Sequence, residues 1–273
     1  MADWLAGPTV ELELEGLWVA DQAGALVGAV LARRLPGRTA QVWPAQAVTP
    51  DSSDVCAALV ATVAEWLPQQ GIRTAQALLD AEGGPEHAQL LASGFDHVAD
   101  LHLQILFLDK RTATDARPEL PEGVALIPYA PELRSRLSGI VARTYQDSLD
   151  CPRLDRRRDV EGLLEQYASH GESGTRNWHL VQIGAVDAGC LLLADDRSLG
   201  YCEIVYMGLA PEFRGRRIGS ALVRFAQDQA QARGFARLTL AVDALNEPAL
   251  EVYARQGFVT WETKRAYFRE FGP

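Results

Sequence analysis

The sequence predicts an α/β protein built from two tandem copies of one fold. Three observations support this: an internal repeat, the same order of strands and helices in both copies, and a linker between them. At one constant offset, Ala58–Val60 falls on Ala221–Val223 and Gly94–Phe95 falls on Gly257–Phe258. A register kept without a gap over such a stretch indicates a duplicated structural unit. Strands that alternate with helices predict an α/β sheet in each copy.

Each copy is expected to open its matching region with an apolar strand, at Gln41–Thr49 and at Cys202–Ala210, which a proline ends. A helix follows in both copies. In the second copy its apolar residues have the i, i+3, i+4, i+7 spacing that places them on one buried face; they are Ile218, Ala221, Leu222 and Phe225.

The later elements correspond as well. Gly71 and Gly234 stand at the C-terminal ends of the predicted helices, where a capping residue in the left-handed conformation belongs. A short strand follows (75–79 and 238–242), then a helix with a proline at its start, then Gly-Phe and a last strand. The polar, proline-rich segment Asp109–Gly123 is interpreted as the linker. We therefore expect domains at 1–112 and 121–273, with a linker at about 109–122.

The second copy contains an extra segment, roughly Pro131 to His170, that the first copy lacks. We expect a helix at Glu132–Tyr145, then a proline-broken loop and a second helix. Two interpretations remain open: the segment recognises a substrate, or its helices cover one face of the sheet. Under the first interpretation the candidate residues are Tyr145, Asp147, Asp150 and Arg153.

Composition narrows the functional classes. The chain has 273 residues, 48% of them hydrophobic, which gives room for two domains with real cores. A net charge of −10 argues against general nucleic-acid binding and mildly favours a cationic substrate. No apolar run approaches the ~20 residues that span a bilayer, and the chain starts without the pattern of a signal peptide. We expect a cytoplasmic protein without membrane contact.

The cysteines and histidines predict no metal site. The four cysteines have no CxxC spacing, so neither zinc nor a disulfide framework is expected. Cys151 has no histidine near it in sequence and is not expected to be a nucleophile. His170 and His179 are predicted to be surface or packing residues.

An arginine- and glycine-rich loop precedes the second-copy helix. Helix starts expose unpaired amides and the positive end of the helix dipole, so they bind anions, and the loop glycines let a ligand approach. No GxxxxGK[ST] motif is present and no GxGxxG motif follows a strand. The loop therefore predicts a diphosphate site; the alternative is a solvated basic helix start. In the first copy, acids and serines that can cap a helix replace the arginines; they are Asp51, Ser52, Ser53 and Asp54.

The stretch Val205–Phe258 resembles the acetyl-CoA-binding core of the general-control-type N-acetyltransferases (GNAT superfamily), whose loop reads Gln/Arg-x-x-Gly-x-Gly/Ala. Arg214 and Gly219 match its first and last positions, whereas Arg217 stands where glycine is usual. The resemblance covers about Gly123–Tyr267, and the first half looks like a degenerate copy that lacks the loop. The whole is similar in plan to mycothiol synthase. The resemblance implies two acetyltransferase-fold repeats, each a mixed, mostly antiparallel sheet flanked by helices.

By this resemblance the cofactor is acetyl-CoA, used as a co-substrate. Its pantetheine arm is expected along the strand edge at Met207, Gly208 and Leu209, where a backbone N–H would polarise the thioester carbonyl. The diphosphate is expected at the amides of the loop and helix start, namely Arg214, Gly215, Arg216, Arg217, Ile218, Gly219 and Ser220. Asn246 either contacts the cofactor or substrate or is an ordinary N-cap.

Acetyl transfer to an amine needs a base for the amine and an acid for the thiolate. Tyr253 is the candidate acid, because the family has a tyrosine at this place and the first copy has Leu90. Glu203 is the candidate base, by resemblance to the histone-acetyltransferase branch; the alternative is an outward-facing strand carboxylate. Asp243 is a weaker candidate, since the first copy keeps Asp80 at its position.

These residues predict an N-acetyltransferase that moves an acetyl group to a primary amine by direct attack in a ternary complex. The acceptor is an unidentified small molecule or peptide, and the chain is expected to be a monomer or homodimer. Two other classes remain open: a non-catalytic acyl-CoA-binding or regulatory module, and an interaction scaffold.

Overall fold

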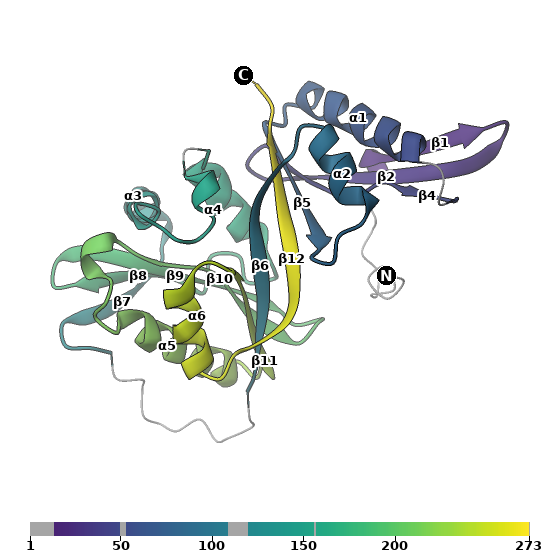
Figure 1. Cartoon of the computed structure of the whole chain (residues 1–273). Helices are drawn as coiled ribbons and strands as arrows, with labels where there is room; N and C mark the ends of the chain where they lie inside the picture. Colours follow the sequence, from purple (N-terminus) through teal and green to yellow (C-terminus); the bar gives the residue numbers. More distant parts are fainter. Residues whose placement is uncertain (1–13, 50–52, 109–119, 156, 273) are drawn as a thin grey trace. The chain divides into compact units, whose positions relative to one another are not determined.

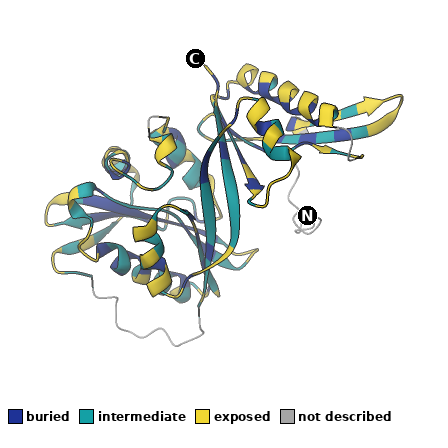
Figure 2. Cartoon of the chain, viewed as in Figure 1, coloured by how far each residue is buried: buried dark blue, intermediate teal, exposed yellow. Residues whose placement is uncertain are grey.

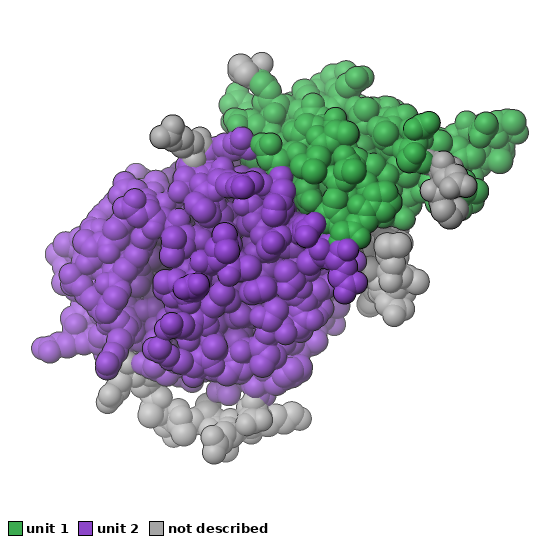
Figure 3. Space-filling view, viewed as in Figure 1, with its two compact units in different colours: residues 1–79, 83–96, 267–273 green, residues 80–82, 97–266 purple. Residues whose placement is uncertain are grey.

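The computed structural model describes residues 14–49, 53–108, 120–155 and 157–272 (Figure 1). These residues form two compact units (Figure 3). Unit 1 comprises residues 1–79, 83–96 and 267–273, and unit 2 comprises residues 80–82 and 97–266. Residues 109–119 of the predicted linker lie outside the described residues. Among the described residues, no helix combines the length and the apolar character needed to cross a membrane.

The two units differ from the predicted domains 1–112 and 121–273. Residues 97–107, the last strand of the first copy, belong to unit 2, where they pair antiparallel with residues of the second copy from Leu101↔Asp243 to Phe107↔Arg237. Residues 267–272 belong to unit 1, where Arg73 O accepts the amide of Phe271. Local sequence patterns predict strands but not their partners, so they did not reveal this exchange.

Unit 1 is a mixed sheet in the order β1-β2-β3-β5, followed by the end of β12. The β1–β2, β2–β3 and β2–β4 pairs are antiparallel, and β3–β5 is parallel. Its elements are η2 (Leu14–Gly16), β1 (Leu17–Gln22), β2 (Ala25–Leu35), β3 (Thr39–Val42), β4 (Gln46–Ala47), α1 (Ser53–Gln69), β5 (Thr74–Asp80) and α2 (Pro85–Ala92).

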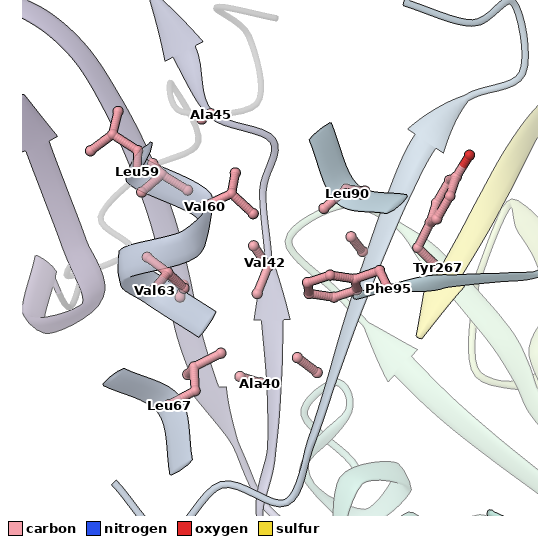
Figure 4. Close-up of a cluster of buried hydrophobic side chains, with 14 of the residues drawn as sticks. Ala40, Val42, Ala45, Leu59, Val60, Val63, Leu67, Leu90, Phe95 and Tyr267 are labelled. Atoms are coloured by element: carbon pink, nitrogen blue, oxygen red, sulfur yellow. The ribbon is translucent and has the colours of Figure 1, made fainter. Parts of the chain in front are cut away.

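The core of unit 1 lies between α1 and the sheet. Val60, Val63 and Leu67 of α1 are buried together with Ala40 and Val42 of β3 (Figure 4). The strand expected at 41–49 is instead two short strands, β3 and β4, with Pro44 between them. Proline cannot donate to a strand ladder, which explains the break.

Unit 2 is a sheet in the order β12-β6-β11-β10-β9-β8-β7, in which β10–β11 is parallel and the β7–β8, β8–β9, β9–β10 and β11–β6 pairs are antiparallel. Its strands are β6 (Asp96–Phe107), β7 (Val124–Pro128), β8 (Trp178–Ile183), β9 (Val186–Asp196), β10 (Tyr201–Leu209), β11 (Arg237–Asp243) and β12 (Val259–Glu270). Its helices are η3 (Pro131–Leu133), α3 (Arg134–Thr144), η4 (Pro152–Leu154), α4 (Val160–Ser169), η5 (Pro211–Phe213), α5 (Ile218–Ala232) and α6 (Glu247–Arg255).

Helices cover both faces of this sheet, and β9 is buried along most of its length (Figure 2). One apolar cluster joins the sheet to α5 and α6, and a second joins it to α3 and α4. The predicted α/β class, with a mixed and mostly antiparallel sheet in each repeat, is confirmed.

The duplicated turns take the same backbone form in both copies. Gly71 and Gly234 have φ of +74° and +83°, the left-handed values predicted for helix C-caps. At equivalent places, Leu67 O accepts the Ile72 amide and Ala230 O accepts the Phe235 amide. The repeat seen in the sequence is therefore a repeat of hydrogen bonds.

Candidate functional site

The sheet of unit 2 opens between β10 and β11. These strands pair only from Tyr201↔Arg237 to Ile204↔Leu240. A bulge then shifts the register of β10 against β9 between Ile204 and Tyr206. Bulges bend a strand and end pairing, so among the described residues the edge of Val205–Leu209 that faces β11 has no strand partner. An extended ligand can add to this edge, where Met207, Gly208 and Leu209 were predicted to bind.

Gly208 lets this part of β10 pack closely against α3. A Cβ at Gly208 would lie 2.8 Å from Cβ of Thr144 and 3.0 Å from the hydroxyl of Tyr206. The side chains of Met207 and Leu209 pack into the cluster on the α5 face. The side chains therefore fix the strand, and its free backbone edge is the surface left for a ligand.

The start of α5 presents a run of unpaired amides. The Arg214 amide donates to Pro211 O (3.2 Å), and the Ala221 amide donates to Arg217 O (3.3 Å). Between them, the amides of residues 215–220 have no acceptor in the part of the chain that the structure describes. No acid lies in the first turn of α5. This helix start therefore has the free donors and the dipole that an anion needs.

The side chain of Arg214 is held by backbone carbonyls. Its Nε donates to Leu209 O (3.0 Å), its Nη1 to Asp147 O (2.8 Å), and its Nη2 to Thr144 O (2.9 Å) and Gln146 O (2.8 Å). Arg214 thus ties the end of β10 to the end of α3. Its guanidinium is engaged, so Arg216 and Arg217, both exposed, are the arginines left to meet a ligand.

Arg217 occupies a left-handed conformation, with φ of +60° and ψ of 10°, directly before α5. A residue with a Cβ is strained there, and glycine is not. The backbone thus explains why glycine is usual at this position of the resembled motif. Gly215, with φ of +74°, supplies the other left-handed residue of the loop.

Tyr253 lies in the core face of α6 and is 7% exposed. Its ring packs against Phe258 at 5.7 Å between centroids. Burial, followed by the negative charge of Asp150, raises the pKa of the Tyr253 phenol well above its ordinary value of 10. The phenol is therefore protonated at neutral pH, which is the state that an acid requires.

Glu203 lies on β10 just before the bulge, and its carboxylate pairs with His170. The distance from His170 Nε2 to Glu203 Oε2 is 2.8 Å. The hydrogen bond to Glu203 raises the pKa of His170. Sequence reasoning missed this partner, because the two residues come from different elements far apart in the chain. His170 directly follows the predicted helix of the extra segment, which was the available signal.

Asn246 and Asp243 have structural bonds. The side-chain oxygen of Asn246 caps α6 by accepting the Ala249 amide (3.4 Å). Asp243 is buried and accepts the amides of Leu245 (2.9 Å) and Cys151 (3.0 Å). Because the first copy keeps Asp80 at the position of Asp243, a structural turn role was favoured for Asp243, and these hydrogen bonds agree with that role.

The extra segment forms the expected helices, α3 and α4, and they cover the face of the sheet opposite α5. Their buried residues share a cluster with the sheet; Leu137, Ile140, Val141, Tyr145 and Leu164 are the main ones. Of the substrate candidates, Asp150 accepts the Asp243 amide (3.2 Å) and Arg153 donates to His97 O (2.8 Å). Covering the sheet is therefore a role that the segment has.

Cys151 was not expected to be a nucleophile, and His179 was expected to be a surface or packing residue. Burial, with Asp150 and Asp243 adding negative charge, raises the pKa of the Cys151 thiol, so its nucleophilic thiolate is disfavoured. His179 packs edge-on against Phe225, with 5.2 Å between ring centroids.

Residues 141–258, which contain the open strand edge and the loop, match the Acetyltransferase (GNAT) family. In sequence, this part of the chain is similar to GNAT acetyltransferases. Among curated relatives, the mycothiol acetyltransferase of Streptomyces bingchenggensis is 40% identical over 164 residues, or 56% of this chain and 48% of the relative. That of Paenarthrobacter aurescens is 27% identical over 198 residues, or 68% of this chain and 58% of the relative. The chain thus spans about half the length of these relatives.

Solved GNAT structures share the fold along the whole chain. A GCN5-related N-acetyltransferase from Sphaerobacter thermophilus superposes with a TM-score of 0.67 at 19% identity, covering 100% of this chain and 84% of that one. A tandem GNAT protein from the clavulanic acid biosynthesis pathway gives a TM-score of 0.56 at 19% identity, covering 94% and 83%. The fold is therefore shared with proteins of distant sequence, one of which is a tandem GNAT protein.

Proposed function

We propose that unit 2 transfers an acetyl group from acetyl-CoA to a primary amine by direct attack in a ternary complex. The observation that supports this proposal is that unit 2 has two sets of backbone groups without partners among the described residues. They are the open strand edge of Val205–Leu209 and the amides of residues 215–220. One ligand with an extended arm and a diphosphate uses both. Arg216 and Arg217 add positive charge beside the diphosphate.

The acceptor amine must lose a proton as it attacks. An amine of pKa ~10.4 is about 4.6 kcal/mol from its neutral form at pH 7. We assign the proton, directly or through water, to the carboxylate of Glu203. The hydrogen bond from Glu203 to His170 gives the proton a route to solvent, because the side chain of Glu203 is 23% exposed and that of His170 is 50% exposed. His170 is therefore a positioning residue that passes the proton on to solvent.

The tetrahedral intermediate then collapses, and its C–S bond breaks. Tyr253, whose phenol is protonated at neutral pH, gives its proton to the departing thiolate. In this proposal, strand amides at the open edge, near Met207 and Gly208, stabilise the oxyanion. Asn246 keeps its side-chain NH₂ for the cofactor or substrate while its oxygen caps α6. In this proposal the first copy provides structure and no chemistry.

The test is acetyl transfer measured by mass spectrometry of the acceptor, with acetyl-CoA and a panel of polyamines, amino sugars and aminoglycosides. We expect at least one amine to gain an acetyl group, in step with CoA release. Bound acetyl-CoA with no acetylated amine would contradict the proposal and favour an acyl-CoA-binding module.

A further inference from the structure

A polar cavity lies in unit 2 at the end of α5 opposite residues 214–217, which we call the diphosphate loop because they precede the proposed diphosphate site. Its volume is about 260 Å³. Its walls are the segment 172–177 that joins α4 to β8, the end of β9 with Arg197, and Arg233 at the end of α5. Because α5 has 15 residues, the two ends are about 22 Å apart. We call this site the arginine cavity.

The buried acid of the arginine cavity is already neutralised. Asp195 is 6% exposed, and its Oδ1 pairs with Arg233 Nη1 at 2.5 Å. Its Oδ2 accepts Nδ2 of Asn177 at 3.0 Å. The other acid, Glu172, has an exposed side chain. Neither carboxylate neutralises the two remaining arginines, Arg176 and Arg197, among the described residues.

Hydrogen-bond donors are in excess in the cavity. Arg176 donates to one backbone oxygen, Glu172 O, at 3.0 Å. Arg197 lies over the ring of Phe235, 5.4 Å from its centroid, and has no acidic partner in the described part of the chain. Ser173 is 5% exposed, and its buried hydroxyl has no hydrogen-bond partner there. A buried polar group without a partner is costly, so this arrangement calls for acceptor oxygens.

We propose that the arginine cavity binds a small oxyanion ligand, a metabolite that carries a phosphate or carboxylate group. Arg176 and Arg197 contact its oxygens, and Ser173 donates from the buried side. Asp195 and Arg233 form the fixed wall. The site does not depend on the proposed acetyl transfer. One consequence of the site does rest on the proposed function. The cavity wall begins just after His170, so a bound ligand restrains the residue that pairs with Glu203.

The segment is pinned at that place. Glu172 donates its amide to Asp195 O at 2.8 Å. Gly171 has φ of +69°, and a Cβ there would lie 2.4 Å from Asp195 O. A ligand that fixes Arg176 and Ser173 therefore restrains the chain between the arginine cavity and His170.

The test is calorimetric titration with inorganic phosphate and, separately, with citrate. It uses the wild type, two double variants and one single variant. Arg176→Gln with Arg197→Gln removes the cavity charges, and Arg216→Gln with Arg217→Gln removes those of the diphosphate loop. Arg224→Gln removes an exposed arginine in the middle of α5 and is the matched control. All these arginines except Arg176 and Arg197 lie outside the cavity, and melting curves verify that each variant folds.

We expect the cavity variant to weaken binding of one of the two anions by at least about tenfold, with the Arg224→Gln control unchanged. Any phosphate that binds at the start of α5 is lost in the loop variant instead, so the two sites are told apart. The anion that responds identifies phosphate or carboxylate chemistry. Binding that is lost only in the loop variant would overturn the proposal while supporting the diphosphate site. Absence of binding in the wild type, or equal binding in the cavity variant, would also overturn it. Neither result depends on turnover, so failure of the proposed function is distinguishable.

Discussion

The same hydrogen-bonded turn ends the last helix of both copies, but the residue whose carbonyl accepts the hydrogen bond has a different side chain in each. Leu90 O accepts the Phe95 amide (3.0 Å), and Tyr253 O accepts the Phe258 amide (3.1 Å). Leu90 is fully buried, whereas Tyr253 is 7% exposed and carries a phenol. The fold needs an apolar residue at this place, and leucine satisfies that need. The hydroxyl of Tyr253 is therefore the part that structure alone does not explain.

The helix that follows the parallel strand shows the same contrast. The first turn of α1 contains Asp54, and that of α5 contains no acid. An acid in the first turn satisfies the dipole from within the chain and repels phosphate. Asp51 and Ser52, also predicted to close the first-copy site, lie outside the described residues. Both copies thus keep the helix, but only the start of α5 combines unpaired amides with a first turn that lacks an acid among the described residues.

The largest effect expected is that of Tyr253→Phe, which removes the phenol and keeps the ring. We expect kcat to fall by about 10²–10⁴-fold, with acetyl-CoA affinity unchanged, because the acid acts only on the leaving thiolate. Steady-state kinetics and calorimetry measure the two quantities. Tyr129→Phe in the same unit is the matched control and should retain full activity. A Tyr253→Phe enzyme with normal kcat would remove the chemical distinction between the copies.

The Glu203–His170 pair, which belongs to the second copy, predicts a pH dependence of kcat/KM. Glu203 raises the pKa of His170 above its ordinary 6.5, and Asp196 adds to this. Below the raised pKa, His170 is an imidazolium and cannot take the proton from Glu203, so kcat/KM should increase as pH rises through that pKa.

His170→Gln keeps a hydrogen-bond donor and removes the titration, so the rise in kcat/KM should move to lower pH. Glu203→Gln should lower kcat by about 10²-fold or more at every pH. The pH profiles of the three proteins decide the matter; an unshifted profile for His170→Gln would show that the pair only packs.

Arg214 and Arg216 separate structure from binding within one loop. Arg214→Ala loses four bonds to carbonyls, so we expect the free energy of unfolding to fall by about 2–4 kcal/mol. Arg216→Ala should leave the melting temperature unchanged and weaken acetyl-CoA binding several-fold. Thermal melts and calorimetry on both variants give the answer; equal effects on stability would contradict the assignment of Arg214 as a tie.

The smallest effect concerns the strained residue before α5. Arg217→Gly relieves a positive φ, so we expect a gain in stability of about 0.5–1 kcal/mol despite the flexibility of glycine. Arg216→Gly, where φ is not positive, should give no gain. Denaturant unfolding measures both. If Arg217→Gly is destabilising, the left-handed conformation is not that of the folded loop.

Sequence reasoning predicted what depends on local pattern. The repeat, the left-handed glycines Gly71 and Gly234 and the helices of the extra segment follow from spacing and residue type. The acetyltransferase fold was implied by the resemblance of Val205–Phe258 to a known family. The exchange of residues 97–107 and 267–272 between units depends on strand pairing, which no local pattern encodes. The bonds of Arg214 and the His170–Glu203 pair likewise join segments distant in sequence.

The central claim is that one copy alone has an anion site for acetyl-CoA. Calorimetric titration with acetyl-CoA tests it directly, on the wild type and on Arg216→Glu with Arg217→Glu, which leaves the structural Arg214 in place. We predict one site per chain in the wild type and loss of binding in the variant. Two sites per chain, or unchanged binding in the variant, would contradict the claim.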